Sequence, residues 1–234
     1  MRYELYYWPE IQGRGEFVRL ALEEAGADYV DVARTKGGMS TMMRLLETGE
    51  RPPFAPPFLR AGKLLIAQTA EILLYLGARH DLAPKGEVGR LWVHQCQLTL
   101  ADFLVEVHDT HHPIASGLYY ENQKSEAKRR AADFLANRLP KFLGYFENIL
   151  ARNPRGGLAG AKLCYADLSL FQMVEGLFYA FPNAMARRRS QYPRIFALRD
   201  RVATRPRVAA YLESERRIPF NEKGIFRHYP ELDG

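Results

Sequence analysis

The sequence predicts two parts of different fold class, a small α/β domain over residues 1–80 and an all-helical domain over residues 90–234. Three observations lead to this prediction. Runs typical of strands alternate with helical patterns only before residue 80. Residues 77–89 contain Pro84 and Gly86 and few apolar residues, which is typical of a linker. After it, the apolar residues recur at the spacing of helices alone.

The predicted α/β domain opens with a strand, a helix and a second strand. Residues 2–8 are rich in tyrosine, which favours strands. A helix begins at Arg14 or Gly15, has one apolar face and ends with Gly26 as its C-cap. Residues 29–32 form the next strand. A strand, helix and strand of this size make a βαβ unit, which is expected to be parallel and right-handed.

A short helix, a hairpin and a final helix are predicted to complete this domain. Residues 39–46 have a helical pattern. Two apolar runs at 58–59 and 64–67 flank a turn that contains glycine, and this pattern predicts a β-hairpin. A helix over 70–78 completes the order β-α-β-α-β-β-α, which resembles the thioredoxin fold.

The helical domain is predicted to begin with a long helix over residues 91–107 that is buried on more than one side. A second helical pattern spans 127–150, and Pro140 should kink or divide it. A third helix spans 165–181, and shorter helices follow from Pro193 onward.

Composition narrows the class of protein. Hydrophobic residues make up 47% of the chain and charged residues 26%, as in a soluble globular protein. The most apolar stretch, 163–181, contains Asp167 and Glu175, so we expect a buried helix there and no membrane span. No secretion signal opens the sequence, and Cys96 and Cys164 are far apart. We therefore expect a cytoplasmic protein without a disulfide or zinc framework.

The charge distribution gives little indication of a nucleic-acid partner. The net charge of +6 is modest for a chain of 234 residues. The basic run Arg187-Arg188-Arg189 has no accompanying pattern of aromatic residues for base stacking. We interpret this run as a solvated loop.

A candidate binding site lies within residues 54–76. Pro56-Pro57 stands before the first hairpin strand, and a cis bond at such a position would bend the chain sharply. Gln68-Thr69 then presents a side-chain oxygen and free backbone N–H groups at a helix start, which is a ready anion site. A bent, open strand entry beside this helix end suits a small peptide that carries a carboxylate.

This stretch, with Pro-Phe-Leu, a hairpin and then Gln-Thr-x-x-Ile, resembles the glutathione-binding half of cytosolic glutathione transferases. The resemblance covers nearly the whole chain. It implies a thioredoxin-like domain before a helical domain, glutathione as co-substrate, a small and largely apolar electrophile as second substrate, a role in detoxification, and a homodimer. It also implies Pro57 as the cis-proline and Gln68 and Thr69 as ligands of the γ-glutamyl carboxylate. Since Pro56 has no N–H, one backbone bond to glutathione is expected to be missing.

The start of the helix predicted at residue 165 supports this resemblance. In the family, the central helix commonly begins with a Ser/Thr-x-x-Asp capping box. Here Asp167 fits the third helical position, and Leu163 with Leu168 can form the hydrophobic staple. Cys164 takes the place of the hydroxyl residue and is a poorer cap.

The segment Tyr7-Trp8-Pro9…Gly13-Arg14 resembles the Tyr-aromatic-Pro…Gly-Arg pattern of the pi, sigma and alpha-like classes, with one extra residue in the loop. The resemblance implies that Tyr7 is catalytic and donates its hydroxyl hydrogen to the glutathione sulfur. A free thiol has a pKa near ~8.5, and lowering it by about two units takes roughly 2.7 kcal/mol of preferential thiolate stabilisation. A phenol in a water-poor cleft can supply much of this. Tyr6 is the alternative if the strand register differs by one.

The resemblance implies roles for several other residues. Trp8 and Arg14 are candidates to line the glutathione site, and Asp102 of the other subunit is the candidate to face the γ-glutamyl amine. The glycine carboxylate normally meets a basic residue, here one of Lys36, Arg44 and Arg51. Candidates for the electrophile site are Asp109, His112 and Phe220. Core packing, capping or surface charge remain the alternative roles of these residues.

Other functions stay open. The loop after the first strand has no cysteine, so thiol-disulfide exchange is not expected. On a helix, His108, His111 and His112 share a face and could bind zinc, although Pro113 predicts that the helix ends there and no metal is expected. A ligand-binding protein or subunit that keeps the fold without turnover is the main alternative, because Pro56 removes one contact to glutathione.

Overall fold

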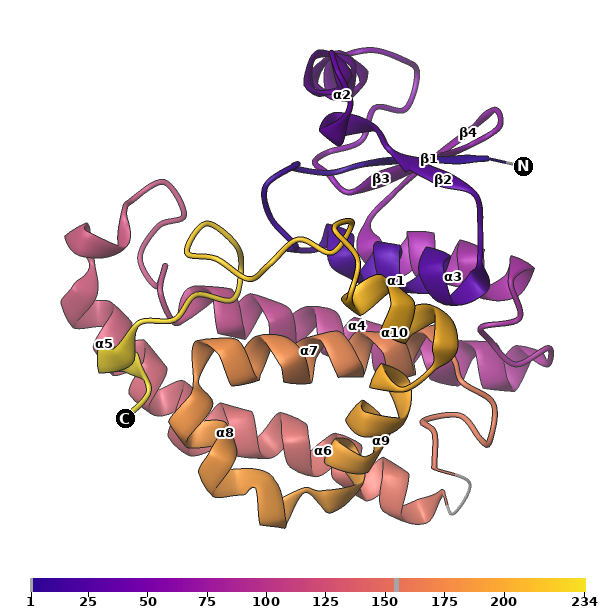
Figure 1. Ribbon diagram of the computed structural model, residues 1–234. Coiled ribbons are helices and arrows are strands. Elements are labelled where there is room, and N and C mark those ends of the chain that lie inside the picture. Colours follow the sequence, from indigo (N-terminus) through magenta and orange to yellow (C-terminus); the bar gives the residue numbers. More distant parts are fainter. Residues whose placement is uncertain (1, 154–155) are drawn as a thin grey trace.

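The computed structural model describes residues 2–153 and 156–234 and opens with a four-stranded sheet and three helices (Figure 1). The strands are β1 (Tyr3–Tyr6), β2 (Tyr29–Asp31), β3 (Phe58–Ala61) and β4 (Leu64–Ala67), in the order β2-β1-β3-β4. The helices are α1 (Gly15–Ala25), α2 (Gly38–Glu47) and α3 (Thr69–Arg79). β1 and β2 are parallel, and β3 and β4 form an antiparallel hairpin, so the predicted βαβ unit and hairpin are confirmed.

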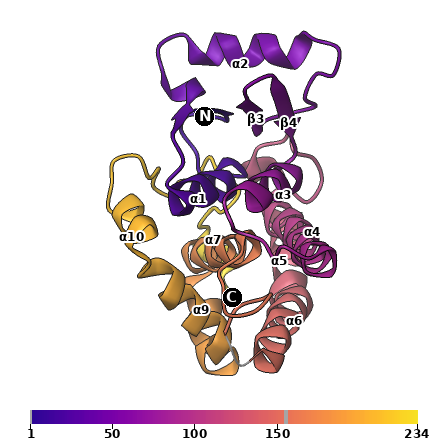
Figure 2. The same cartoon turned by 90° about the vertical axis from the view of Figure 1, so that its right-hand side faces the viewer.

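The sheet separates two apolar layers. Figure 2 shows α2 on one side of the strands, and α1 and α3 on the other side, where the helical part also lies. Because successive strand residues point to opposite faces, Tyr6 packs with Met42 and Phe58 on the α2 side. Leu5 and Leu59 belong to one core that continues through α1 and α3 into the helical part. Since this core spans both parts, the division into 1–80 and 90–234 stays a prediction.

The rest of the chain is mostly helical. Its helices are α4 (Glu87–Asp109), α5 (Lys124–Asp133), α6 (Leu139–Arg152), α7 (Tyr165–Ala180), α8 (Pro182–Arg188), α9 (Pro193–Ala203) and α10 (Pro206–Leu212). α7 contacts α1, α4 and α9, and nearly all of its side chains are buried. At its start, the backbone N–H of Cys164 donates to Asp167 Oδ2 at 2.8 Å, which confirms the predicted capping box.

Two elements differ from the predicted ranges for a physical reason. The stretch predicted as one helix with a break at Pro140 consists of α5, a π-helical segment (Phe134–Arg138) and α6. Proline cannot donate an N–H to the preceding turn, and the wider π turn lies directly before it. β1 ends at Tyr6, so Tyr7 lies just past the strand and belongs to the following loop.

The C-terminal tail, residues 213–234, returns across the molecule. In Figure 1 it passes the loop that follows β1 and ends beside α5. Ile225 and Phe226 are buried, and a Cβ built at Gly176 of α7 would come within 2.4 Å of the Phe226 ring. The tail is therefore packed into the fold. No helix in the described ranges has both the length and the apolar character that a membrane crossing requires.

Candidate active site

Tyr7 lies at the start of the loop that joins β1 to α1. Its side chain is 4% exposed, and its hydroxyl oxygen accepts a hydrogen bond from the Arg14 backbone N–H at 2.8 Å. Two glycines let the loop approach the ring. A Cβ at Gly13 would lie 2.1 Å from the hydroxyl oxygen, and one at Gly15 would lie 2.5 Å from ring atom Cδ1. The loop and the phenol therefore fit together only with glycine at these positions.

Arg19 of α1 holds this loop from inside the protein. Its buried guanidinium donates to the Gln12 carbonyl at 3.3 Å, to Glu16 at 3.2 Å and to Asp31 at 2.8 Å. Burial would lower the pKa of Arg19, but the carboxylates of Glu16 and Asp31 raise it overall. The side chain stays a cation, and its guanidinium carbon lies 5.8 Å from the centroid of the Tyr7 ring.

The Tyr7 hydroxyl keeps a proton to donate. Burial raises the pKa of Tyr7, and the Arg14 N–H offsets only part of this rise. The side chain is therefore a neutral phenol at physiological pH. Its oxygen already accepts one hydrogen bond, and no residue in the described part of the chain accepts its O–H. This hydrogen remains available to an acceptor such as a sulfur atom.

Tyr6, the alternative if the register were shifted, lies on the opposite face of the sheet. Its ring stacks on Phe58 with 4.6 Å between centroids, and its hydroxyl donates to Glu4. Burial and this hydrogen bond raise the pKa of Tyr6 to about 12. The Tyr6 hydroxyl is thus engaged on the α2 side, away from the loop that carries Arg14.

The hairpin leads from a bent entry to a helix start. The Pro56–Pro57 peptide bond is cis, as the family resemblance implied. After β4, Gln68 has a positive φ of 67°, a conformation that is uncommon outside glycine and concentrates at functional sites. No described side chain caps α3, which begins at Thr69. Its first backbone N–H groups are therefore available to an anion.

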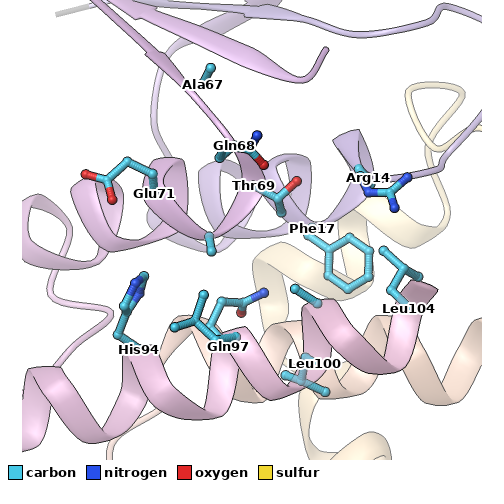
Figure 3. A pocket seen from close by; sticks show the side chains of 13 residues that line it. Arg14, Phe17, Ala67, Gln68, Thr69, Glu71, His94, Gln97, Leu100 and Leu104 are labelled. Atoms are coloured by element: carbon cyan, nitrogen blue, oxygen red, sulfur yellow. The ribbon is translucent and has the colours of Figure 1, made fainter. Parts of the chain in front are cut away.

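A cavity of about 440 Å³ lies between α3 and α4 (Figure 3). It is lined by Arg14, Phe17, Ala67, Gln68, Thr69, Ala70, Glu71, His94, Gln97, Leu98, Leu100, Ala101 and Leu104. The cavity thus brings together Gln68, Thr69 and Arg14 from the residues predicted to bind glutathione. Tyr7 is not among the described lining residues, but Arg14 links it to the cavity through the N–H that bonds the phenol.

The other residues predicted to bind glutathione lie outside this cavity. Trp8 is 37% exposed, and Asp102 is exposed on α4. The three basic candidates for the glycine carboxylate are also exposed, and none lines the cavity as far as the structure describes the chain: Lys36, Arg44 and Arg51. The choice among these three stays open, and so do the roles of Trp8 and Asp102.

The electrophile-site candidates are not gathered around one cavity in the described ranges. Asp109 Oδ1 lies 3.2 Å from the Nδ1 of the neighbouring histidine. His112 is buried, and its Nδ1 lies 3.2 Å from the Gln123 amide nitrogen. Phe220 stacks on Tyr179 with 5.0 Å between ring centroids. The proposed contacts of these residues with a second substrate remain predictions.

The C-terminal tail covers the loop next to Tyr7. The side-chain amide of Gln12 donates to the Ile218 carbonyl, and Lys223 pairs with Glu10 at 2.7 Å. Between loop and tail the structure leaves a void of only about 10 Å³. A second substrate beside this loop therefore needs the tail to move or has to approach from another side.

The three histidines at the end of α4 pack together and contact the tail. Their ring centroids lie 4.7–5.3 Å apart. His111 Nε2 lies 2.8 Å from the Ile225 carbonyl, and His108 and His112 bond to neighbouring side chains. Burial lowers the pKa of His111 to about 3 and that of His112 to about 4. The described residues include no group of histidine, cysteine and acidic side chains arranged to hold a metal ion.

Two polar residues of the cavity were missed by the sequence analysis, His94 and Gln97. They lie on α4 with Ala101 and Leu104, at spacings of three and four residues that define one helical face. That spacing is visible in the sequence. The prediction that α4 is buried on several sides hid the fact that this face borders a cavity.

Comparison with known proteins agrees with the fold and the site. Residues 108–215 match the family model described as glutathione S-transferase, C-terminal domain. The chain is 26% identical to glutathione S-transferase P 1 of Xenopus laevis over 222 residues, which cover 92% of this chain and 93% of the relative.

Two solved structures share the fold. The pi-class glutathione S-transferase of Onchocerca volvulus superposes with a TM-score of 0.75 at 23% identity, covering 96% of this chain and 99% of that one. The monomeric Na-GST-3 of the hookworm Necator americanus has a TM-score of 0.70 at 20% identity, with 95% and 100% covered. A mixed sheet with a cis-proline and an uncapped α3, followed by helices, defines the class of fold. The chain belongs to the cytosolic glutathione transferase family.

Proposed function

We propose that this protein is a glutathione transferase that joins the glutathione sulfur to a small, largely apolar electrophile. The observation that carries the proposal is the Tyr7 hydroxyl. It accepts the Arg14 N–H and keeps its own O–H free of any acceptor in the described part of the chain. Arg14 also lines the cavity at the start of α3, so donor and anion site adjoin.

In this proposal glutathione binds across the loop and the cavity. Its γ-glutamyl carboxylate accepts hydrogen bonds from Gln68, Thr69 and the first N–H groups of α3. The carbonyl of Pro56 accepts the N–H of the cysteine residue, and the reciprocal bond is missing because Pro56 has no N–H. The sulfur then lies at Tyr7, which stabilises the thiolate by donating its O–H.

The reaction needs only the thiolate and a positioned electrophile. The thiol proton passes to solvent, the sulfur lone pair forms the new S–C bond, and a leaving group departs with its electron pair. Tyr7 stays a phenol throughout, since burial raises its pKa. The rate gain comes from the larger thiolate fraction and from holding both reactants together.

Binding and turnover test this proposal separately. The protein should be retained on immobilised glutathione and eluted by free glutathione. It should also accelerate the reaction of glutathione with chlorodinitrobenzene or with another electrophile of a varied panel. A protein that neither binds the resin nor accelerates any of these reactions would contradict the proposal.

A glutathione-binding protein without turnover is the second candidate. Two observations favour it: Pro56 lacks an N–H for the ligand, and the tail leaves only about 10 Å³ beside the loop that holds Gln12 and Gly13. Retention on glutathione with no acceleration of any electrophile in the panel would support this function over catalysis.

A homodimer in the cytoplasm is part of the proposal. Leu91, Leu98 and Val105 recur every seven residues along α4 and are 64%, 48% and 45% exposed. Phe54, in a loop between prolines, is 94% exposed. Such an apolar stripe and a single exposed ring suit a partner surface. Cys96 and Cys164 are both free thiols, as expected in a reducing compartment.

Replacing Leu98 by glutamate tests the dimer. A carboxylate in the centre of the stripe should convert a dimer to a monomer, measured by sedimentation velocity at fixed concentration. Thr99→Glu, one residue away on the same helix, is the matched control. A wild-type protein that sediments as a monomer would contradict this part of the proposal.

A further inference from the structure

Three polar atoms of the cavity between α3 and α4 lack a hydrogen-bond partner among the described residues. They are Thr69 Oγ1, His94 Nδ1 and Gln97 Oε1. Gln97 matters most, because its side chain is only 2% exposed and a buried acceptor without a donor is costly. Figure 3 shows His94 and Gln97 projecting from α4 toward the start of α3. The cavity is therefore arranged to receive a group that donates hydrogen bonds.

The two walls of the cavity offer opposite kinds of groups. The α3 wall presents donors, which are the N–H groups of its uncapped first turn, and Arg14 adds a guanidinium. The α4 wall presents acceptors, which are Gln97 Oε1 and, in the matching tautomer, His94 Nδ1. An α-amino acid head group carries a carboxylate and an ammonium on the same carbon. It can meet both walls at once.

We propose that Gln97 binds the α-ammonium group of the γ-glutamyl residue while the carboxylate binds at the start of α3. The inference rests on the proposed function and adds a ligand-binding residue supplied by the same chain. Asp102, which the family resemblance assigns to this ammonium from the other subunit, is exposed and is not among the described lining residues. Gln97 is buried at the cavity wall and needs no second subunit.

Glu71 and an ordered water are the two rivals of this role for Gln97. Glu71 also lines the cavity and carries a carboxylate, but it is exposed, and in Figure 3 it points away from Gln97. An ordered water could satisfy Gln97 without any ligand. In either case the preference of the protein for an ammonium would not depend on Gln97.

The experiment compares two peptides on the full-length protein by isothermal titration calorimetry. One is glutathione, and the other is glutaryl-cysteinylglycine, which lacks only the ammonium group. Gln97→Met keeps the length of the side chain and removes its acceptor. Gln95→Met is the matched control, because Gln95 is an exposed glutamine of the same helix that is not among the described lining residues. Glu71→Gln tests the rival carboxylate.

Wild type should bind glutathione about tenfold more tightly than the analogue, since a hydrogen bond to a charged group is worth this much. Gln97→Met should reduce this ratio to about threefold or less, whereas Gln95→Met and Glu71→Gln should keep it. A ratio that is unchanged in Gln97→Met, or that collapses only in Glu71→Gln, overturns the inference. Wild type that binds neither peptide overturns the proposed function itself. If Gln97→Met does not melt cooperatively, Gln97→Ala repeats the comparison.

Discussion

The substitution Tyr7→Phe tests the proposed catalytic group with the smallest possible change. It removes one oxygen atom and keeps the ring, which Gly13 and Gly15 approach closely. Two interactions are lost at once. The thiolate of bound glutathione loses a donor, and the Arg14 N–H loses the oxygen that accepts it at 2.8 Å. The first loss acts on the pKa of the ligand, and the second acts on the stability of the protein.

The size of both effects follows from the structure. A hydrogen bond to a charged group contributes about 1.5–3 kcal/mol, and one pKa unit corresponds to about 1.4 kcal/mol. The pKa of the bound thiol should therefore rise by about one to two units in Tyr7→Phe. Conjugation below the pKa of the thiol should slow by about tenfold or more, as the thiolate fraction falls. The unpaired Arg14 N–H should cost roughly 1 kcal/mol of folding stability.

The assay is a pH titration of the ultraviolet absorbance of the thiolate, with the protein saturated by glutathione. Tyr6→Phe is the matched control, because its hydroxyl bonds Glu4 on the other face of the sheet. The thiol pKa in Tyr6→Phe should equal that of wild type. Equal thiol pKa values in wild type and Tyr7→Phe would remove Tyr7 from its role. The same is true if both substitutions raise the pKa equally, since the effect would then be general.

Two further predictions concern stability. Because burial lowers the pKa of His111 in the folded protein to about 3, the unfolded chain binds more protons below about pH 6.5, and stability falls with pH in that range. This residue alone should cost about 2 kcal/mol between about pH 7.5 and pH 5, and urea unfolding of His111→Gln should show a shallower loss. Cys164→Thr should raise the free energy of unfolding by about 1 kcal/mol or less, because a hydroxyl caps α7 better than a thiol. A lower melting temperature in Cys164→Thr would count against the capping role.

Local rules of sequence were sufficient for most of the fold. Gly26 ends α1 with φ 62°, as expected of a glycine C-cap. The turn at Gly62 closes the hairpin, and the break at Pro140 separates α5 from α6. Each of these features depends on residues close in the chain, so the residue type alone determines the backbone. The cis bond before Pro57 came from the family resemblance and not from such a rule.

The candidate site was only partly predictable. Gln68 and Thr69 could be placed at a helix start, but the cavity that they border exists only because α4 packs against α3. Which face of α4 meets α3 depends on tertiary packing, and Gln97 was missed for this reason. The path of the tail was equally hidden. Whether Ile225 lies in solvent or against His111 is decided by residues more than a hundred positions away.

The position of Tyr7 likewise depends on parts of the chain that are distant in sequence. Gln12, in the same loop, donates to Ile218 of the tail and accepts from Gln172 of α7 at 2.7 Å. Glu16 at the start of α1 accepts from the Tyr211 hydroxyl of α10 at 2.7 Å. These buried bonds cost free energy unless both partners are present. Residues 1–80 alone would expose Gln12 and Glu16 without these partners, and the loop that orients the phenol would lose half of its support. The helical part therefore contributes to the chemistry of the sulfur without contacting it.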